Sequence, residues 1–146
     1  MSHFHKSDLM VVKQVLFICI GNSCRSPMAE GFANYYGRGW LTAFSIGSHP
    51  AGFLMPNTIK VMQEKGIDIS SQSSKGQESV DLKRMNWIVI LESSLAGFID
   101  PLPPRTELLH WFLPDPVGES IEFYREVRDQ IELKVLDFLE KVRKSA

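Results

Sequence analysis

Short apolar runs alternate along this chain with segments in which apolar residues recur every three or four positions. The runs at 14–19 (QVLFIC), 41–46 and 87–91 are typical of strands that are buried on both faces of a parallel sheet. A shorter run at 108–112 predicts a fourth strand. Because such strands need covering layers on both sides, the pattern predicts an α/β fold.

Three segments carry helix signals. The first has Ser26 as a candidate N-cap with a proline directly behind it, and the last shows apolar residues at steps of three and four. The helices are expected from Ser26 to Gly37 or Gly39, from Pro56 to Gly66, and from Ser120 to Arg143. With the strands they predict a single three-layer domain, in which helices cover both faces of a central, parallel, four-stranded sheet.

The length and the charge balance restrict the function classes. A chain of 146 residues suggests one domain, and 16 basic against 17 acidic residues give a net charge of −1. This balance offers no electrostatic reason to bind nucleic acid or an anionic membrane. No apolar run is long enough for a signal peptide or a membrane span, so we expect a cytoplasmic protein. Residues 1–8 are expected to form a flexible tail and residues 9–146 the domain.

The chain has two cysteines, Cys19 and Cys24. Two cysteines cannot build a disulfide framework or a four-cysteine zinc site. A domain of this size needs no disulfide for its stability. The cysteines are therefore of interest for their reactivity.

The turn between the first strand and the first helix, residues 19–27 (CIGNSCRSP), is where we expect the chemistry. In parallel sheets ligands bind beyond the carboxyl ends of the strands. Consecutive N–H groups in this turn lack strand or helix partners, so they can bind an anion, and the dipole of the following helix favours it. The expected anion-binding residues are Ile20, Gly21, Asn22, Ser23, Cys24 and Arg25.

Two side chains of this turn indicate a reaction type. The N–H groups and the helix N-terminus would stabilise a thiolate at Cys19. The guanidinium of Arg25 can bind two oxygens of a phosphate. These features favour attack of the thiolate on a tetrahedral oxyanion of phosphorus or arsenic, followed by a covalent intermediate on sulfur. The leaving oxygen would then need a proton from a general acid.

Residues 15–30 (VLFICIGNSCRSPMAE) resemble the low-molecular-weight protein-tyrosine phosphatases and the arsenate reductases built on the same fold. The resemblance continues through most of the chain. Further matching motifs are Ser45–Ser48, Gly66–Ser70, His110–Trp111, Asp115–Pro116 and Val127–Ile131. The resemblance implies a phosphate-binding loop after the first strand of a low-molecular-weight phosphatase-like domain.

The resemblance also implies the catalytic residues. Cys19 matches the nucleophile and Arg25 matches the arginine that binds the oxyanion. Ser26 matches the hydroxyl that donates a hydrogen bond to the thiolate. Asp115, which precedes a proline, matches the general acid.

Two further positions match supporting roles. Asn22 would hold the loop together, with Ser45 as its partner. Cys24 matches a second loop cysteine of the family. It is a candidate redox partner, because a reversible disulfide with Cys19 would protect the nucleophile from overoxidation.

The chain departs from both branches of the family. Phosphatases of the family usually have aromatic residues after the Asp-Pro pair, whereas this chain has Val117 and Gly118. The thioredoxin-coupled reductases need two further cysteines after the third strand, and residues 91–99 (LESSLAGFI) contain none. Within that segment Glu92–Leu95 resembles the acid-containing loop of the phosphatases.

Three hypotheses follow for the function. The main one is a cysteine-dependent phosphatase that hydrolyses a phosphate monoester through a thiophosphate intermediate on Cys19. The alternative is an arsenate reductase of the same fold that uses an external thiol, either glutathione with glutaredoxin or mycothiol. The third is a weakly catalytic protein that binds oxyanions.

The expected partners and cofactors follow from the same residues. The loop is expected to bind phosphate, sulfate or arsenate, and the phosphorylated substrate of a phosphatase is not indicated by the sequence. No cofactor is expected. No metal is expected either, because Lys75 stands where the reductases have a carboxylate associated with a cation site, and a lysine disfavours a bound cation.

Overall fold

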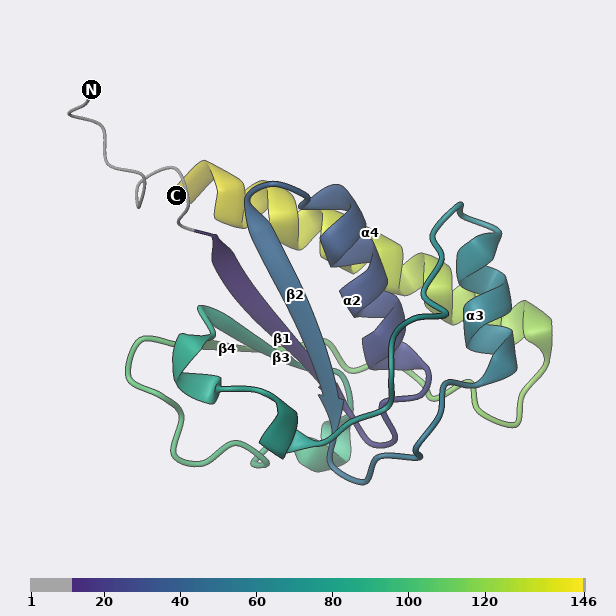
Figure 1. Cartoon of the computed structure of the whole chain (residues 1–146), viewed down its shortest axis with the longest axis horizontal. Helices are drawn as coiled ribbons and strands as arrows, with labels where there is room; N and C mark the ends of the chain where they lie inside the picture. Colours follow the sequence, from purple (N-terminus) through teal and green to yellow (C-terminus); the bar gives the residue numbers. More distant parts are fainter. Residues whose placement is uncertain (1–11, 146) are drawn as a thin grey trace.

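The computed structural model describes residues 12–145, and its centre is a parallel sheet of four strands (Figure 1). The strand order is β2-β1-β3-β4, and all three neighbouring pairs are parallel. The strands are β1 (Lys13–Cys19), β2 (Leu41–Gly47), β3 (Trp87–Ile90) and β4 (Glu107–His110). The parallel α/β fold predicted from the apolar runs is therefore confirmed.

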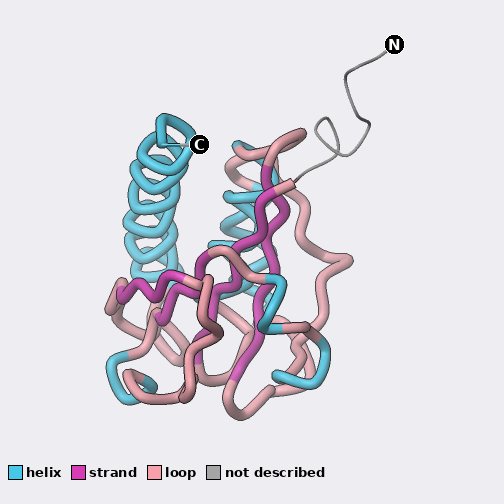
Figure 2. The backbone as a smooth tube through the Cα atoms, turned by 90° about the vertical axis from the view of Figure 1, so that its left-hand side faces the viewer, coloured by secondary structure: helices cyan, strands magenta, loops and turns pink. Residues whose placement is uncertain are grey.

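The α-helices pack together on one face of the sheet (Figure 2). They are α2 (Arg25–Tyr36), α3 (Pro56–Gln63) and α4 (Ile121–Ser145). Because successive strand residues point to opposite faces, Val15, Phe17 and Cys19 of β1 join the core under these helices. The long amphipathic helix α4 contributes Val127 and Ile131 to the same core.

The other face of the sheet is covered by short 3-10 helices and their connecting loops. Leu16 and Ile18 of β1 pack there with Ile88 and Ile90 of β3. The 3-10 helices are η1 (Gln77–Ser79), η2 (Leu82–Arg84) and η3 (Ser93–Leu95). The predicted three layers are present. In the layer on this face, the helices are single turns of 3-10 helix.

Several element boundaries differ from the prediction. Ser26 is not the N-cap of α2, because the helix already begins at Arg25 and Cys24 precedes it. The hydroxyl of Ser26 instead faces the Sγ of Cys19, so it is not available to cap the helix. The strand predicted at 108–112 lies at Glu107–His110, and α3 ends at Gln63 rather than Gly66.

The predicted tail at residues 1–8 lies outside the described residues. Within residues 12–145, no helix is long and apolar enough to cross a membrane. The carboxyl ends of β1 and β3 and the N-terminus of α2 meet at one edge of the sheet. This edge holds the segment in which we expected the chemistry.

Candidate active site

The loop of residues 20–24 connects β1 to α2 and closes tightly on the end of β2. Asn22 adopts φ of 47°, the only positive φ of a non-glycine residue in the described chain. Gly47 lets the loop approach, because a Cβ at that position would lie 2.5 Å from the Ile20 carbonyl oxygen and 2.8 Å from the Asn22 nitrogen. The tight turn therefore depends on Asn22, which tolerates a positive φ, and on Gly47, which has no side chain.

The carbonyl groups of this loop are held by the segment after β2. The backbone N–H groups of His49, Ala51 and Met55 donate to loop carbonyls at 2.8–2.9 Å; the acceptors are Ile20, Gly21 and Ser23. In a trans peptide the N–H points opposite to the carbonyl. The following N–H groups therefore point away from residues 49–55 and toward the interior of the loop, as an anion cradle requires.

A chain of short hydrogen bonds connects Cys19, the candidate nucleophile, to the interior of the protein. The Sγ of Cys19 lies 2.9 Å from the Oγ of Ser26. The side-chain amide of Asn22 donates to Ser26 at 2.8 Å and to Ser45 at 2.9 Å. The expected contact of Ser26 with Cys19 and the expected pairing of Asn22 with Ser45 are both present.

The guanidinium of Arg25 is buried beside the loop. Its Nη1 donates to the carbonyl oxygen of Leu113 at 2.8 Å and lies 2.9 Å from the Oε1 of Glu92. Burial raises the pKa of Glu92, but the hydrogen bonds from Arg25 and Ser94 outweigh burial and leave it below its usual value. Glu92 is therefore an ionised partner that holds the arginine in place.

Asp115 lies at the rim of the same site. Its Oδ2 is 3.8 Å from the Nη2 of Arg25, and its Oδ1 accepts a hydrogen bond from the backbone of Val117. About half of its side chain is exposed, so solvent can deliver protons to it. This position suits a group that protonates a leaving oxygen.

The loop and Asp115 enclose a cavity of about 200 Å³. Its lining residues are Cys19, Ile20, Gly21, Ser23, Cys24, Arg25, Ala51, Met55, Asp115 and Val117. The described lining includes no aromatic side chain. The cavity is small enough to suit a compact anion.

Cys24 is unlike Cys19 in its surroundings. It is buried, both cysteines are free thiols, and burial raises the pKa of Cys24 to about 12 despite a hydrogen bond with Thr58. Because the thiolate is the reactive form, Cys24 is a slow nucleophile near neutral pH. Its role as a redox partner of Cys19 stays a prediction.

Glu92 lies in the segment that resembles the acid-containing loop of the phosphatases. The carboxylate caps η3 by accepting from the backbone N–H of Ser94, but its side chain is only 18% exposed and pairs with Arg25. Sequence reasoning also missed Glu30, which accepts a hydrogen bond from Ser45 behind the loop. No local pattern marks these contacts, because the partners lie far apart in the sequence.

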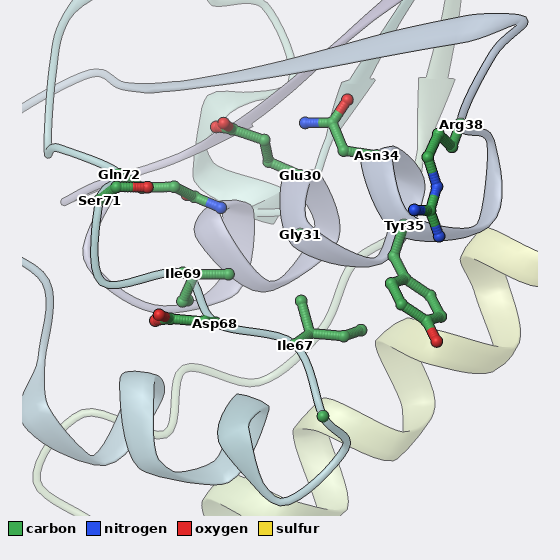
Figure 3. A pocket seen from close by; sticks show the side chains of 11 residues that line it. Glu30, Gly31, Asn34, Tyr35, Arg38, Ile67, Asp68, Ile69, Ser71 and Gln72 are labelled. Carbon is green, nitrogen blue, oxygen red and sulfur yellow. The ribbon is translucent and has the colours of Figure 1, made fainter.

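A larger groove of about 410 Å³ lies elsewhere, between α2 and the segment 66–72 (Figure 3). Its lining includes Glu30, Arg38 and Asp68, but not Cys19. The larger groove is therefore not the candidate active site, because Cys19, the candidate nucleophile, lines the smaller cavity. Among residues 12–145, no cluster of three His, Cys, Asp or Glu side chains could hold a metal ion.

Comparison with known proteins agrees with the class of site that the loop defines. Residues 14–146 match the family model described as low molecular weight phosphotyrosine protein phosphatase. The chain belongs to this family. It is an enzyme of the superfamily that also contains arsenate reductases of the same fold.

Particular relatives come from both branches. A glutaredoxin arsenate reductase of Synechocystis is 38% identical over 135 residues, covering 90% of this chain and 99% of the relative. A solved arsenate reductase in the phosphate-binding state is 36% identical with a TM-score of 0.79, covering 89% of this chain and 98% of its own. A low molecular weight protein tyrosine phosphatase of T. tengcongensis is 26% identical with a TM-score of 0.78. The match covers 88% of this chain and 99% of the phosphatase chain.

Proposed function

We propose that this chain reduces arsenate by means of Cys19 and a thiol supplied from outside the chain. The main hypothesis from the sequence was a phosphatase, and the names of the relatives favour the alternative over it. The need for an external thiol rests on the cysteine count. Cys24 is the one other cysteine of the chain, and it is buried with a raised pKa. A second thiol for the reduction must therefore come from another molecule.

In the first step the thiolate of Cys19 attacks the arsenic atom of arsenate. A sulfur–arsenic bond forms, and one oxygen leaves as water after it receives a proton from Asp115. Arg25 and the loop N–H groups stabilise the negative charge on the remaining oxygens. The cradle that these groups form beside the Sγ of Cys19 supports this step.

In the second step an external thiolate attacks the Sγ of Cys19. A disulfide bond forms, and the electron pair of the sulfur–arsenic bond leaves with arsenic, which is thereby reduced from arsenate to arsenite. A second external thiol then reduces the mixed disulfide and restores Cys19. In the overall reaction, one arsenate and two thiols give arsenite, one disulfide and water.

Hydrolysis of a phosphate monoester is the second candidate. Asp115 beside Arg25 and Cys19 supports it, because the same acid can protonate the leaving oxygen of an ester. The cavity favours arsenate, because no aromatic side chain in the described lining is present to pack against a phenyl ring. An oxyanion-binding protein with little turnover is the third candidate.

One comparison of substrates tests the proposal. The protein is assayed with arsenate in three mixtures: with glutathione and glutaredoxin, with mycothiol and a mycothiol-dependent reductant, and with thioredoxin alone. A fourth assay uses para-nitrophenyl phosphate as the substrate. We expect arsenite in the first or second assay and none with thioredoxin alone, with Cys19→Ser inactive as the matched control. Ester hydrolysis without arsenite would favour the phosphatase, and phosphate binding without any turnover would favour the binding protein.

A further inference from the structure

The outer face of α4 presents two exposed leucine side chains that the proposed reaction does not use. The helix forms one side of the molecule (Figure 2). Leu133 is 69% exposed, which makes it the most exposed large hydrophobic residue of the described chain, and Leu136 is 39% exposed. Residues three apart on a helix are neighbours on its surface, so the two leucines form one apolar patch.

A cavity of about 260 Å³ lies beside this patch. Its lining residues are Leu113, Gln130, Leu133, Lys134 and Asp137. Leu113 supplies an apolar wall, and the aliphatic stem of Lys134 can extend that wall while its ammonium group stays in water. The face therefore has both a protruding leucine and a cavity that can accept a leucine from another molecule.

The charges of α4 are divided unequally between its two halves. Residues 121–132 have four acidic and two basic side chains, whereas residues 133–145 have two acidic and four basic ones. The first half therefore has a net charge of −2 and the second a net charge of +2. Two copies of this helix attract each other when they run antiparallel, because each acidic half then faces a basic half. A parallel pair would place like charges together.

We propose that the outer face of α4 binds the same face of a second copy of this chain. The two α4 helices run antiparallel around a two-fold axis, so that Leu133 of each copy enters the cavity of the other. The interface is isologous, because one surface supplies both the leucine and the cavity that receives it. A closed dimer follows, since the two copies use up each other's face.

The spacing of residues on α4 determines the register of this dimer. A two-fold axis beside Val135 places Leu133 opposite the partner's Asp137, which lines the receiving cavity. The same axis places Glu126 opposite the partner's Lys144. Glu126 and Lys144 are 18 residues apart, which is five helical turns, and Leu133 is about two turns from Glu126. The three side chains therefore lie along one side of the helix.

Glu126 and Lys144 are suited to pair between copies. Both are exposed, and neither forms an ion pair with another residue of the described chain. The two-fold axis makes each contact occur twice, so the dimer has two such pairs. Asp129 also lies opposite the partner's Lys141, but these two residues already have ion-pair partners in their own chain. The pair of Glu126 and Lys144 is therefore the better probe of the interface.

The proposed dimer leaves both candidate active sites open. Asp115 precedes the start of α4, and the helix has 25 residues. At 1.5 Å per residue the helix is about 37 Å long. In an antiparallel pair the two Asp115 segments therefore lie at opposite ends of the interface. The inference concerns a surface remote from Cys19 and does not depend on the reaction that this cysteine performs.

Sedimentation equilibrium of the full chain at low salt tests the proposal. We expect a reversible dimer within about 5–500 µM protein, as for a small transient interface. Leu133→Lys should raise the Kd of the dimer at least about tenfold, because it would bury an unpaired ammonium group in the partner's cavity. The matched control Phe53→Lys changes a phenylalanine that is 56% exposed outside α4, and it should leave the Kd unchanged. Circular dichroism shows whether each variant is folded.

A charge reversal tests the register. Glu126→Lys should raise the Kd at least about threefold, because it places two ammonium groups opposite each other twice in the dimer. The double variant Glu126→Lys with Lys144→Glu should restore the Kd, because the reversed charges are again complementary. The matched control Glu119→Lys makes the same charge change at an exposed residue before α4 and should leave the Kd unchanged.

Three results would overturn the proposal. A monomer over the whole concentration range would do so, and it would leave this face to a different kind of partner. An unchanged Kd in a folded Leu133→Lys protein would show that the chain associates through another surface. A double variant that dimerises no better than Glu126→Lys alone would exclude the antiparallel register. The charge reversal needs no change at Leu133, so it decides the question even if Leu133→Lys does not fold.

Discussion

The buried pair of Arg25 and Glu92 allows a quantitative prediction about stability. Glu92→Gln keeps the size of the side chain and removes its charge, while Arg25 keeps its hydrogen bond to Leu113. A hydrogen bond to a charged group contributes about 1.5–3 kcal/mol, and its neutral equivalent about 0.5–1.5 kcal/mol. The difference predicts a loss of about 1–2 kcal/mol in the free energy of unfolding near neutral pH, or about 2–8 °C in Tm for a protein of this size.

The effect has a defined dependence on pH. The pKa of Glu92 in the folded protein lies below its value in the unfolded chain, for which 4.5 is the reference. Its stabilisation is therefore present above that reference value and is lost as the pH falls through the folded pKa. The wild type and Glu92→Gln should therefore differ most in their free energy of unfolding near pH 7, about two units above the reference value. The difference should disappear at acidic pH.

Thermal unfolding followed by circular dichroism at a series of pH values measures both parts of the prediction. Glu140→Gln, a substitution of an exposed glutamate on α4, is the matched control and should change Tm little at any pH. An equal loss of Tm in Glu92→Gln at neutral and acidic pH would show that packing, rather than charge, explains the effect. No loss at neutral pH would refute the stabilising role of the pair.

Two further predictions concern the chemistry of the site. Asp115→Asn should slow hydrolysis of alkyl phosphates at least about tenfold more than hydrolysis of para-nitrophenyl phosphate, because only a poor leaving group needs the proton. Equal losses of steady-state rate on both substrates would show that Asp115 is not the general acid. Cys24→Ser should keep most of the rate of arsenate reduction with glutathione and glutaredoxin, because the raised pKa makes Cys24 a slow nucleophile. A complete loss of this activity in a folded variant would show that Cys24 resolves the intermediate.

The fold could largely be predicted from the sequence, because its signals are local. The apolar runs of β1, β2 and β3 are short and bounded, and each is found within one or two residues of its predicted position. The start of α2 was misjudged for a local reason as well. Ser26 has the residue type of an N-cap, but its hydroxyl is used by Cys19 and Asn22.

The residue pattern alone points to the part of the site that lies within one segment, while Asp115 and Ser45 were expected only from the family resemblance. The loop from Cys19 to Arg25 follows a strand and precedes a helix, so its candidate residues can be predicted from that local context. The partners that hold it were not found, because Glu92 and Lys75 reach the loop through the tertiary fold. Charged residues of this kind look like surface residues until the packing places them beside a buried group.

The product on Cys19 after a single turnover tests the central claim most directly. The protein is mixed with arsenate and one external monothiol in the absence of glutaredoxin, then quenched in acid and digested for mass spectrometry. We predict one arsenite for each active site and a mixed disulfide between Cys19 and the external thiol. Arsenite accompanied by a Cys19–Cys24 disulfide, or no arsenite from a protein that hydrolyses phosphate esters, would contradict the account.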